Sequence, residues 1–221
     1  YWHWTFGPYD DPYVPSGYHP FIKIVDNGND RSGILELLPP YDSPPYDFDN
    51  TITTPGPYQA RTGAYILDGI DDYVSLTSNQ NTSFTYAMWV RPDVTNKQMD
   101  IFRLTEYPAS DSYDRNLVLN SNGQVTAYLN DGSIKTLTST NGLVAGIWTH
   151  IAVTSDGTNF VIYINGSEDN RVAAGVSAAN FITPEFVLGQ AKMTPNFFEG
   201  QLSDIMLFDY SLSAPEIASL A

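Results

Sequence analysis

Three aspartates lie close together in the stretch "LDGIDDYVSL", residues 67–76. Asp68, Asp71 and Asp72 could share a cation, because carboxylate oxygens are the ligands that calcium prefers. The same residues could instead turn the chain, since Asp side chains accept hydrogen bonds from nearby backbone amides and glycine takes the left-handed conformation. The flanking apolar residues predict that one strand ends at Leu67 and that the next begins at Tyr73, which favours the turn.

Paired carboxylates for glycoside hydrolysis are not found in the sequence. A hydrolase that carries its acids on one strand needs them two residues apart, so that alternate side chains share a face. The six glutamates are instead scattered, at positions 36, 106, 168, 185, 199 and 216. There is also no nucleophile elbow, phosphate-binding loop or His-Glu-x-x-His helix. The sequence therefore predicts that the protein is not an enzyme.

Short β-strands account for most of the chain after residue 63. Alternating or β-branched runs are separated by Asn-Gly and Asp-Gly pairs, which are typical of antiparallel hairpins. Ser213 and Glu216 in "SAPEIASL" form a capping-box pattern that predicts one short helix. Strands are expected at 64–68, 72–76, 84–92, 100–106, 116–120, 124–130, 133–139, 147–156, 159–166, 185–190 and 200–210. The predicted fold class is therefore all-β.

Length, charge and cysteine content exclude several other classes. A β-sandwich of 221 residues can be one domain, and we expect a single domain over residues 1–221. The formal charge of −15 repels nucleic acid and anionic lipid, and no apolar run is long enough to span a membrane. With no cysteine, there are neither disulfides nor thiolate metal sites. The opening "YWHWTF" indicates a mature or excised piece.

The first 60 residues differ in composition. They hold most of the 15 prolines and three copies of Pro-Tyr-Asp, which predicts loop insertions at about 7–20 and 39–58. The loops could be irregular segments packed by tyrosine, or they could form a binding or assembly surface. Between them, the segment 21–37 has Asn27-Gly28 at its middle and predicts one more pair of strands.

Five sequence blocks resemble the laminin-G-like jelly rolls of the concanavalin A-like lectin and glucanase superfamily. They follow one another in the order of that family. The blocks are "YWHWTF", "VDNGNDRSGIL", "GAYILDGIDDYVSL" with "FTYAMWVRP", "GIWTHIAVTSDGTNFVIYINGS" and "FEGQLSDIMLFDYSLSAPEI". The resemblance implies an antiparallel two-sheet β-sandwich with one short C-terminal helix. It further implies that Trp89, Trp148 and His150 are buried.

The resemblance also implies a structural calcium ion. In related laminarinases an aspartate on a strand near the C-terminus ligates calcium together with backbone oxygens near the N-terminus, and Asp204 occupies the matching position. Asp26 and Asp30, in the acidic loop "DNGND", are the expected partners. These acids could alternatively form turns only.

Ligand contacts are expected on the concave face of the sandwich, where planar rings stack on sugars and charged groups bond hydroxyls. The candidate residues are Arg103, Tyr107, Tyr113, Asp114, Arg115 and Tyr128.

The sequence predicts a non-enzymatic recognition module, secreted or displayed at the cell surface. Its expected partner is a glycan or an extracellular protein surface. Neither nucleic acid binding nor insertion into a membrane is expected. The alternative is a structural subunit of an extracellular filament or layer that self-associates through the Pro/Tyr-rich loops.

Overall fold

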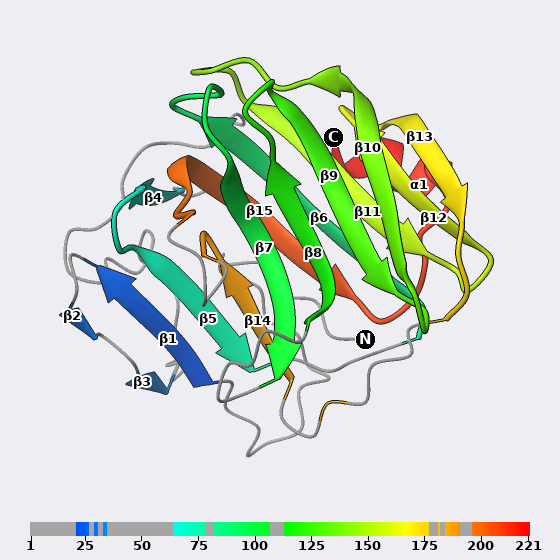
Figure 1. The fold of residues 1–221 in the computed structure, drawn as a ribbon, viewed down its shortest axis with the longest axis horizontal. Helices are drawn as coiled ribbons and strands as arrows, with labels where there is room; N and C mark the ends of the chain where they lie inside the picture. Colours follow the sequence, from blue (N-terminus) through cyan, green and yellow to red (C-terminus); the bar gives the residue numbers. More distant parts are fainter. Residues whose placement is uncertain are drawn as a thin grey trace, which may run out of the picture.

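The chain folds into a sandwich of two antiparallel β-sheets in a computed structural model (Figure 1). The structure describes residues 21–26, 29–30, 33–34, 64–77, 82–106, 113–176, 181, 184–190 and 196–221. This architecture confirms the predicted all-β fold class. The predicted loop insertions at 7–20 and 39–58 lie outside the described residues.

Among the described residues, the larger sheet has nine strands in the order β10-β9-β8-β7-β14-β5-β1-β2, with β3 paired to β1. Its strands are β1 (Phe21–Asp26), β2 (Asn29–Asp30), β3 (Gly33–Ile34), β5 (Tyr73–Thr77), β7 (Met99–Glu106), β8 (Tyr113–Leu119), β9 (Gln124–Asn130), β10 (Ile134–Gly142) and β14 (Pro184–Leu188). The strands predicted around Asn27-Gly28 are therefore present as an antiparallel pair at the edge of this sheet.

The smaller sheet, within the part of the chain that the structure describes, has six strands in the order β13-β12-β11-β6-β15-β4. Its strands are β4 (Tyr65–Asp68), β6 (Phe84–Pro92), β11 (Thr149–Ser155), β12 (Asn159–Ile164), β13 (Ser167–Ala173) and β15 (Glu199–Phe208). Strand β13 was not predicted, because its sequence "SEDNRVA" lacks apolar alternation. It is an edge strand with a largely exposed surface, so its residues need no apolar face.

The core lies between the two sheets, where aromatic side chains from both layers meet. The Tyr86 ring of β6 contacts Phe102 of β7 and Phe186 of β14 edge-on, with ring centroids 5.5 and 5.1 Å apart. Phe102 and Phe186 stack on each other at 5.2 Å. These rings are almost fully buried and join the sheets at the centre of the sandwich.

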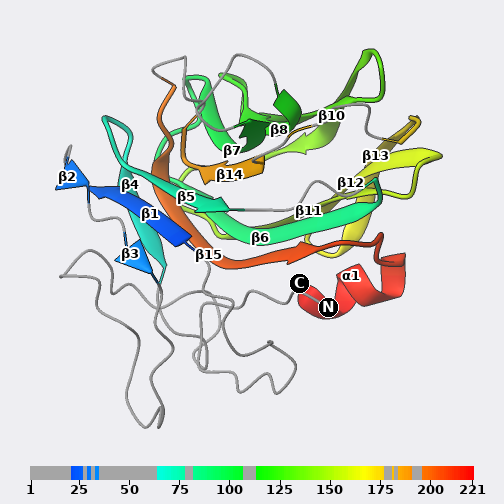
Figure 2. The same cartoon turned by 90° about the horizontal axis from the view of Figure 1, so that it is seen from below.

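Helix α1 (Ala214–Leu220) covers part of the outer face of the smaller sheet (Figure 2). Its buried Ile217 packs with Ala87, Ala152 and Met206, which project from β6, β11 and β15. The predicted capping box is present, with the Ser213 backbone N–H and hydroxyl both donating to the Glu216 carboxylate at 2.7 and 2.6 Å. These bonds lower the pKa of Glu216.

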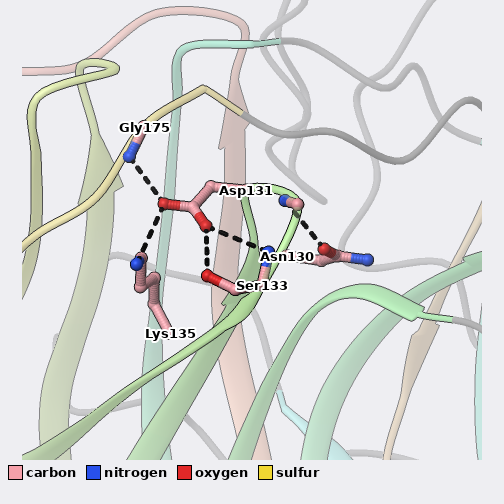
Figure 3. Close-up of polar contacts among 6 residues, drawn as sticks. Asn130, Asp131, Ser133, Lys135 and Gly175 are labelled. Carbon is pink, nitrogen blue, oxygen red and sulfur yellow. Dashed lines mark hydrogen bonds and ion pairs between the residues drawn. The ribbon is translucent and has the colours of Figure 1, made fainter.

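A contact at the β9–β10 hairpin ties the edges of the two sheets together (Figure 3). The Asp131 carboxylate accepts a hydrogen bond from the Gly175 backbone N–H at 2.8 Å, just after β13. Its other oxygen accepts from the Ser133 hydroxyl at 3.0 Å, and the Lys135 ammonium lies 3.6 Å away. The bond from Gly175 is the largest cause of the lowered pKa of Asp131.

The variant Asp131→Asn is expected to have a lower melting temperature than the wild type at neutral pH. Because the folded-state pKa of Asp131 lies below its ordinary value of 3.8, the charge stabilises the fold fully above that value. The benefit disappears as the pH falls through the folded-state pKa. Thermal melts over a pH series should therefore show that the difference in melting temperature between the wild type and Asp131→Asn becomes smaller in acid. A difference that does not change with pH would contradict a stabilising role of the Asp131 charge.

Candidate functional site

The acidic turn between β4 and β5 carries the chain from the smaller sheet to the larger one. The Asp68 carboxylate accepts hydrogen bonds from the backbone N–H groups of Ile70 at 2.8 Å and of Asp71 at 3.4 Å. The Asp72 carboxylate accepts from the Asp68 N–H at 3.1 Å. The prediction that these aspartates shape a turn is confirmed.

The same turn also brings the three carboxylates together. One oxygen from each of Asp68, Asp71 and Asp72 lies within 4.8 Å of the others. Asp71 Oδ1 is buried and has no hydrogen-bond partner among the described residues. An all-oxygen set of this kind fits the chemistry of calcium, although the turn also satisfies its own backbone with these groups.

The predicted calcium ligand Asp204 lies at an irregularity of β15, where the pairing with β6 shifts between Ser203 and Met206. Its backbone has a positive φ of 49°, and its carboxylate accepts from the Ser203 hydroxyl at 3.2 Å. Within the described part of the chain, the close group of three acids does not include Asp204. Asp26 and Asp30 lie at the β1–β2 turn, and their side chains are outside the described part. The calcium site at these residues stays a prediction.

Arg103 and Tyr128 lie in one row across the larger sheet. Arg103 pairs with Asn116 on β8, and Asn116 pairs with Tyr128 on β9, so the three side chains share a face. Arg103 is only 5% exposed, and Tyr128 is half-buried. Tyr107 lies outside the described residues, and only the backbone of Tyr113 belongs to the described part of β8. A role for this row in ligand binding stays a prediction.

Asp114 and Arg115 do not lie on the open face where the sequence placed them. The register between β7 and β8 shifts by one residue at this point, so that Asp114 is an extra residue in its strand. A bulge of this kind redirects side chains, and both residues here are buried in the interior, at 0% and 1% exposure. The predicted surface contact with a ligand does not fit this position.

The buried pair is well packed. Arg115 Nε donates to Asp114 Oδ2 at 2.7 Å, and Nη1 donates to the Tyr86 hydroxyl at 3.3 Å. The guanidinium carbon lies 3.9 Å from the centroid of the Phe84 ring. Arg115 therefore combines an ion pair with a cation–π contact inside the core, which is a structural arrangement.

A groove of about 400 Å³ opens at the edge where the two sheets meet. One wall is formed by the end of β10 and the loop that leads to β11, and the other by the turn between β12 and β13. The groove is lined by Asn141, Gly142, Val144, Ile147, Trp148, Thr149, Ile164, Asn165, Ser167, Glu168 and Asp169. Its volume lies within the range of about 300–1,000 Å³ that is typical of small-ligand sites.

The loop wall of the groove is apolar and exposed. Val144 is 61% exposed and Ile147 is 56% exposed, and the neighbouring Trp148 is half-buried. The prediction that Trp148 is buried inside a strand was wrong, because β11 begins one residue later, at Thr149. The corresponding predictions for Trp89 and His150 are confirmed: both are buried, with ring centroids 5.5 Å apart.

The sequence did not single out this groove. Its residues come from two separate segments, the end of β10 with the β10–β11 loop and the β12–β13 turn, and the polar ones have no spacing that predicts a motif. The available signal was the pair of apolar residues at the end of "NGLVAGIW", a loop sequence that needs no apolar side chains for its own turn.

The order and pairing of the strands define a two-sheet jelly-roll sandwich. A family model described as "Concanavalin A-like lectin/glucanases superfamily" matches residues 68–218. The chain belongs to this family. A comparison with curated proteins gave no match.

Solved structures with the same fold include two domains that were solved with a bound saccharide. One is domain 4 of the extracellular arabinanase AbnA from Geobacillus stearothermophilus in complex with arabinotriose, with 18% identity, a TM-score of 0.62, and coverage of 77% of this chain and 81% of that one. Another is the sialidase CBM40 of Ruminococcus gnavus bound to α2,3-sialyllactose, with 14% identity, a TM-score of 0.55, and coverage of 63% and 82%. The SAP-like pentraxin of Limulus polyphemus has 16% identity, a TM-score of 0.54, and coverage of 77% and 80%. At these identities the likeness shows the fold alone.

Among the residues that the structure describes, no helix has the length and apolar character needed to cross a membrane.

Proposed function

We propose that this chain is a non-enzymatic carbohydrate-binding module that is secreted or displayed at the cell surface. The observation that carries the proposal is the lectin-family sandwich over residues 68–218. Two solved domains of the same fold hold saccharides, arabinotriose in one and α2,3-sialyllactose in the other. The proposed partner is therefore a glycan or an extracellular protein surface. Nucleic acid is not proposed, because a charge of −15 repels it.

The environment of the acidic side chains supports a binding role without catalysis. Glycosidases use two carboxylates that flank the scissile bond across a cleft, at about 5–9.5 Å from each other. Here Glu168 pairs with Arg171, Glu199 pairs with Lys97, and Glu185 accepts a hydrogen bond from Ser75. The groove acid Asp169 accepts the Asn141 backbone N–H at 3.1 Å. Each of these acids already serves a structural contact.

We also propose the structural calcium ion that the family resemblance implies, with Asp204, Asp26 and Asp30 as its side-chain ligands. Calcium takes six to eight oxygen ligands, so backbone carbonyls would have to complete the set. The ion would stabilise the folded state, because a ligand that binds only the folded chain raises the melting temperature.

A glycan array tests the proposed function directly, and the array and a thermal melt are each run with calcium and with a chelator. Binding to a defined saccharide is the expected result. A blank array, combined with association that depends on protein concentration, would favour the assembly subunit instead. If the chelator leaves the melting temperature unchanged, the proposed calcium site is contradicted, while the proposed glycan binding is not affected.

A further inference from the structure

We propose that the groove between the β10–β11 loop and the β12–β13 turn is a saccharide-binding site for neutral sugars, with Trp148 as its stacking platform. This proposal rests on the proposed carbohydrate-binding function and names the place where it is carried out. The groove combines an apolar wall with a wall of amide and hydroxyl groups. A sugar ring has the same two kinds of surface, C–H faces and hydroxyl edges.

The apolar wall offers a surface on which a sugar ring can stack. Val144 and Ile147 are more than half exposed and lie beside the half-buried indole of Trp148. Exposed apolar side chains that gather at a groove mark a binding surface. When a ligand covers them, their removal from water contributes favourably to the free energy of binding. An indole that keeps one part accessible provides a large, rigid contact of this kind.

The β12–β13 turn and the end of β10 offer hydrogen-bonding groups in fixed orientations. The Asn165 side-chain oxygen accepts the His150 backbone N–H at 3.0 Å, which leaves its amide nitrogen as a donor to a ligand. The Asn141 amide nitrogen donates to Asp169, so its oxygen can accept. Ser167 adds an exposed hydroxyl that both donates and accepts. Donors and acceptors are thus mixed, as recognition of sugar hydroxyls requires.

Both walls are held in place before a ligand arrives. Arg91 Nε donates to the Gly146 carbonyl at 3.0 Å, and the Gly146 N–H donates to the Pro92 carbonyl at 2.7 Å. The Asn165 N–H donates to the His150 carbonyl at 2.8 Å. A preformed site loses less conformational entropy on binding, which favours affinity.

Charge selects the class of sugar. Asp169 and the Arg171-paired Glu168 line the groove, and the chain as a whole carries a formal charge of −15. Carboxylated and sulfated saccharides would meet like charge at this position. Neutral saccharides avoid this repulsion, and we therefore infer that the groove binds them in preference to acidic ones.

The test measures the affinity of the wild type and of matched variants by calorimetry. Protein made in bacteria is used, because Asn165-Gly166-Ser167 matches the acceptor pattern for N-glycosylation and an attached glycan would occupy the groove. The probes are the neutral trisaccharides maltotriose, cellotriose and arabinotriose and the acidic α2,3-sialyllactose. Any neutral saccharide that binds the glycan array is added to this set.

Two variants alter the groove, and a control variant carries the same type of substitution at an exposed position outside it. Trp148→Ala is expected to weaken binding of the neutral probe about tenfold or more, as loss of an aromatic hot spot does. Val144→Asp adds charge to the apolar wall without touching the core, and it should weaken binding while the melting temperature is kept. Val176→Asp is the matched control, because Val176 is 53% exposed but does not line the groove. Its affinity should equal that of the wild type.

The outcomes separate the two proposals. If the wild type binds no saccharide, on the array or in calorimetry, the carbohydrate-binding function fails and the groove assignment fails with it. If it binds, but Val144→Asp and Trp148→Ala bind equally well, the function stands and the groove is the wrong place. A Tyr128→Ala variant that loses affinity in that case would point to the face of the larger sheet. Preference for α2,3-sialyllactose over every neutral probe would overturn the inferred selectivity.

Discussion

Replacing Asp114 with alanine is expected to lower the free energy of unfolding by about 3–5 kcal/mol, the usual cost of removing one partner from a buried ion pair. Both side chains of the pair are almost completely buried, at 0% for Asp114 and 1% for Arg115. Without the carboxylate, the guanidinium keeps its contacts with Phe84 and Tyr86 but loses its contact with a negative charge in a medium of low polarity. Urea denaturation monitored by fluorescence measures the change.

The double variant Asp114→Ala with Arg115→Met is the control. It removes both charges and puts an unbranched apolar side chain against the Phe84 and Tyr86 rings, so it should recover a large part of the lost stability. A double-mutant cycle then gives the coupling energy of the pair. If Asp114→Ala lowers the free energy of unfolding by less than about 1 kcal/mol, the effect is that of a solvent-exposed ion pair. Such a result would contradict the buried position of Asp114 and Arg115.

The same residues show how far the sequence could predict this structure. Apolar alternation and Asn-Gly turns located most strands of both sheets, because those strands bury apolar side chains in the core, whereas the largely exposed β13 was missed. The sequence placed Asp114 and Arg115 on the concave face, ahead of a strand expected at 116–120. Both are instead buried in β8, which begins at Tyr113 and contains one extra residue that shifts its register against β7. A bulge depends on the partner strand, which a single sequence does not show.

The candidate site was predictable only in part, for a related reason. The acidic turn at Asp68 to Asp72 was found because its chemistry is local and lies in one stretch of sequence. The groove joins residues of the β10–β11 loop to residues of the β12–β13 turn, some 20 positions later in the chain. Whether Trp148 faces the core or the groove depends on where β11 begins, and strand ends are the least certain feature of a sequence-based prediction.

Edge contacts connect the groove to the stability of the sandwich. Asp169 of β13 accepts the Asn141 N–H of β10, and Asn170 donates to the Thr138 carbonyl at 2.8 Å. Asp131 makes a third link at the other end of β10, through Gly175. These bonds hold the edge strands of the two sheets together, and one of them also positions a groove residue. The site is thus part of the closure of the fold.

A glycine near the start of β15, where this strand pairs with the end of β6, provides the second large effect on stability. Gly200→Ala is expected to lower the free energy of unfolding by about 3 kcal/mol or more, since it combines backbone strain with a steric clash. Gly200 has a φ of 148°, a region that side chains disfavour. An added Cβ would lie 2.3 Å from the Arg91 carbonyl oxygen and 2.8 Å from Pro92 Cα. Both atoms belong to the backbone of β6, so they cannot move without separating the two strands.

Gly175→Ala is the matched control for this substitution. Gly175 has no positive φ in the disfavoured range, and its added Cβ would meet Asp131 Oδ2 at 3.5 Å, an ordinary contact distance. Its stability should therefore stay within about 0.5 kcal/mol of the wild type. Denaturation of both variants under the same conditions measures the difference. Equal losses in the two would mean that flexibility of the unfolded chain, rather than the close approach of β15 to β6, sets the cost at Gly200.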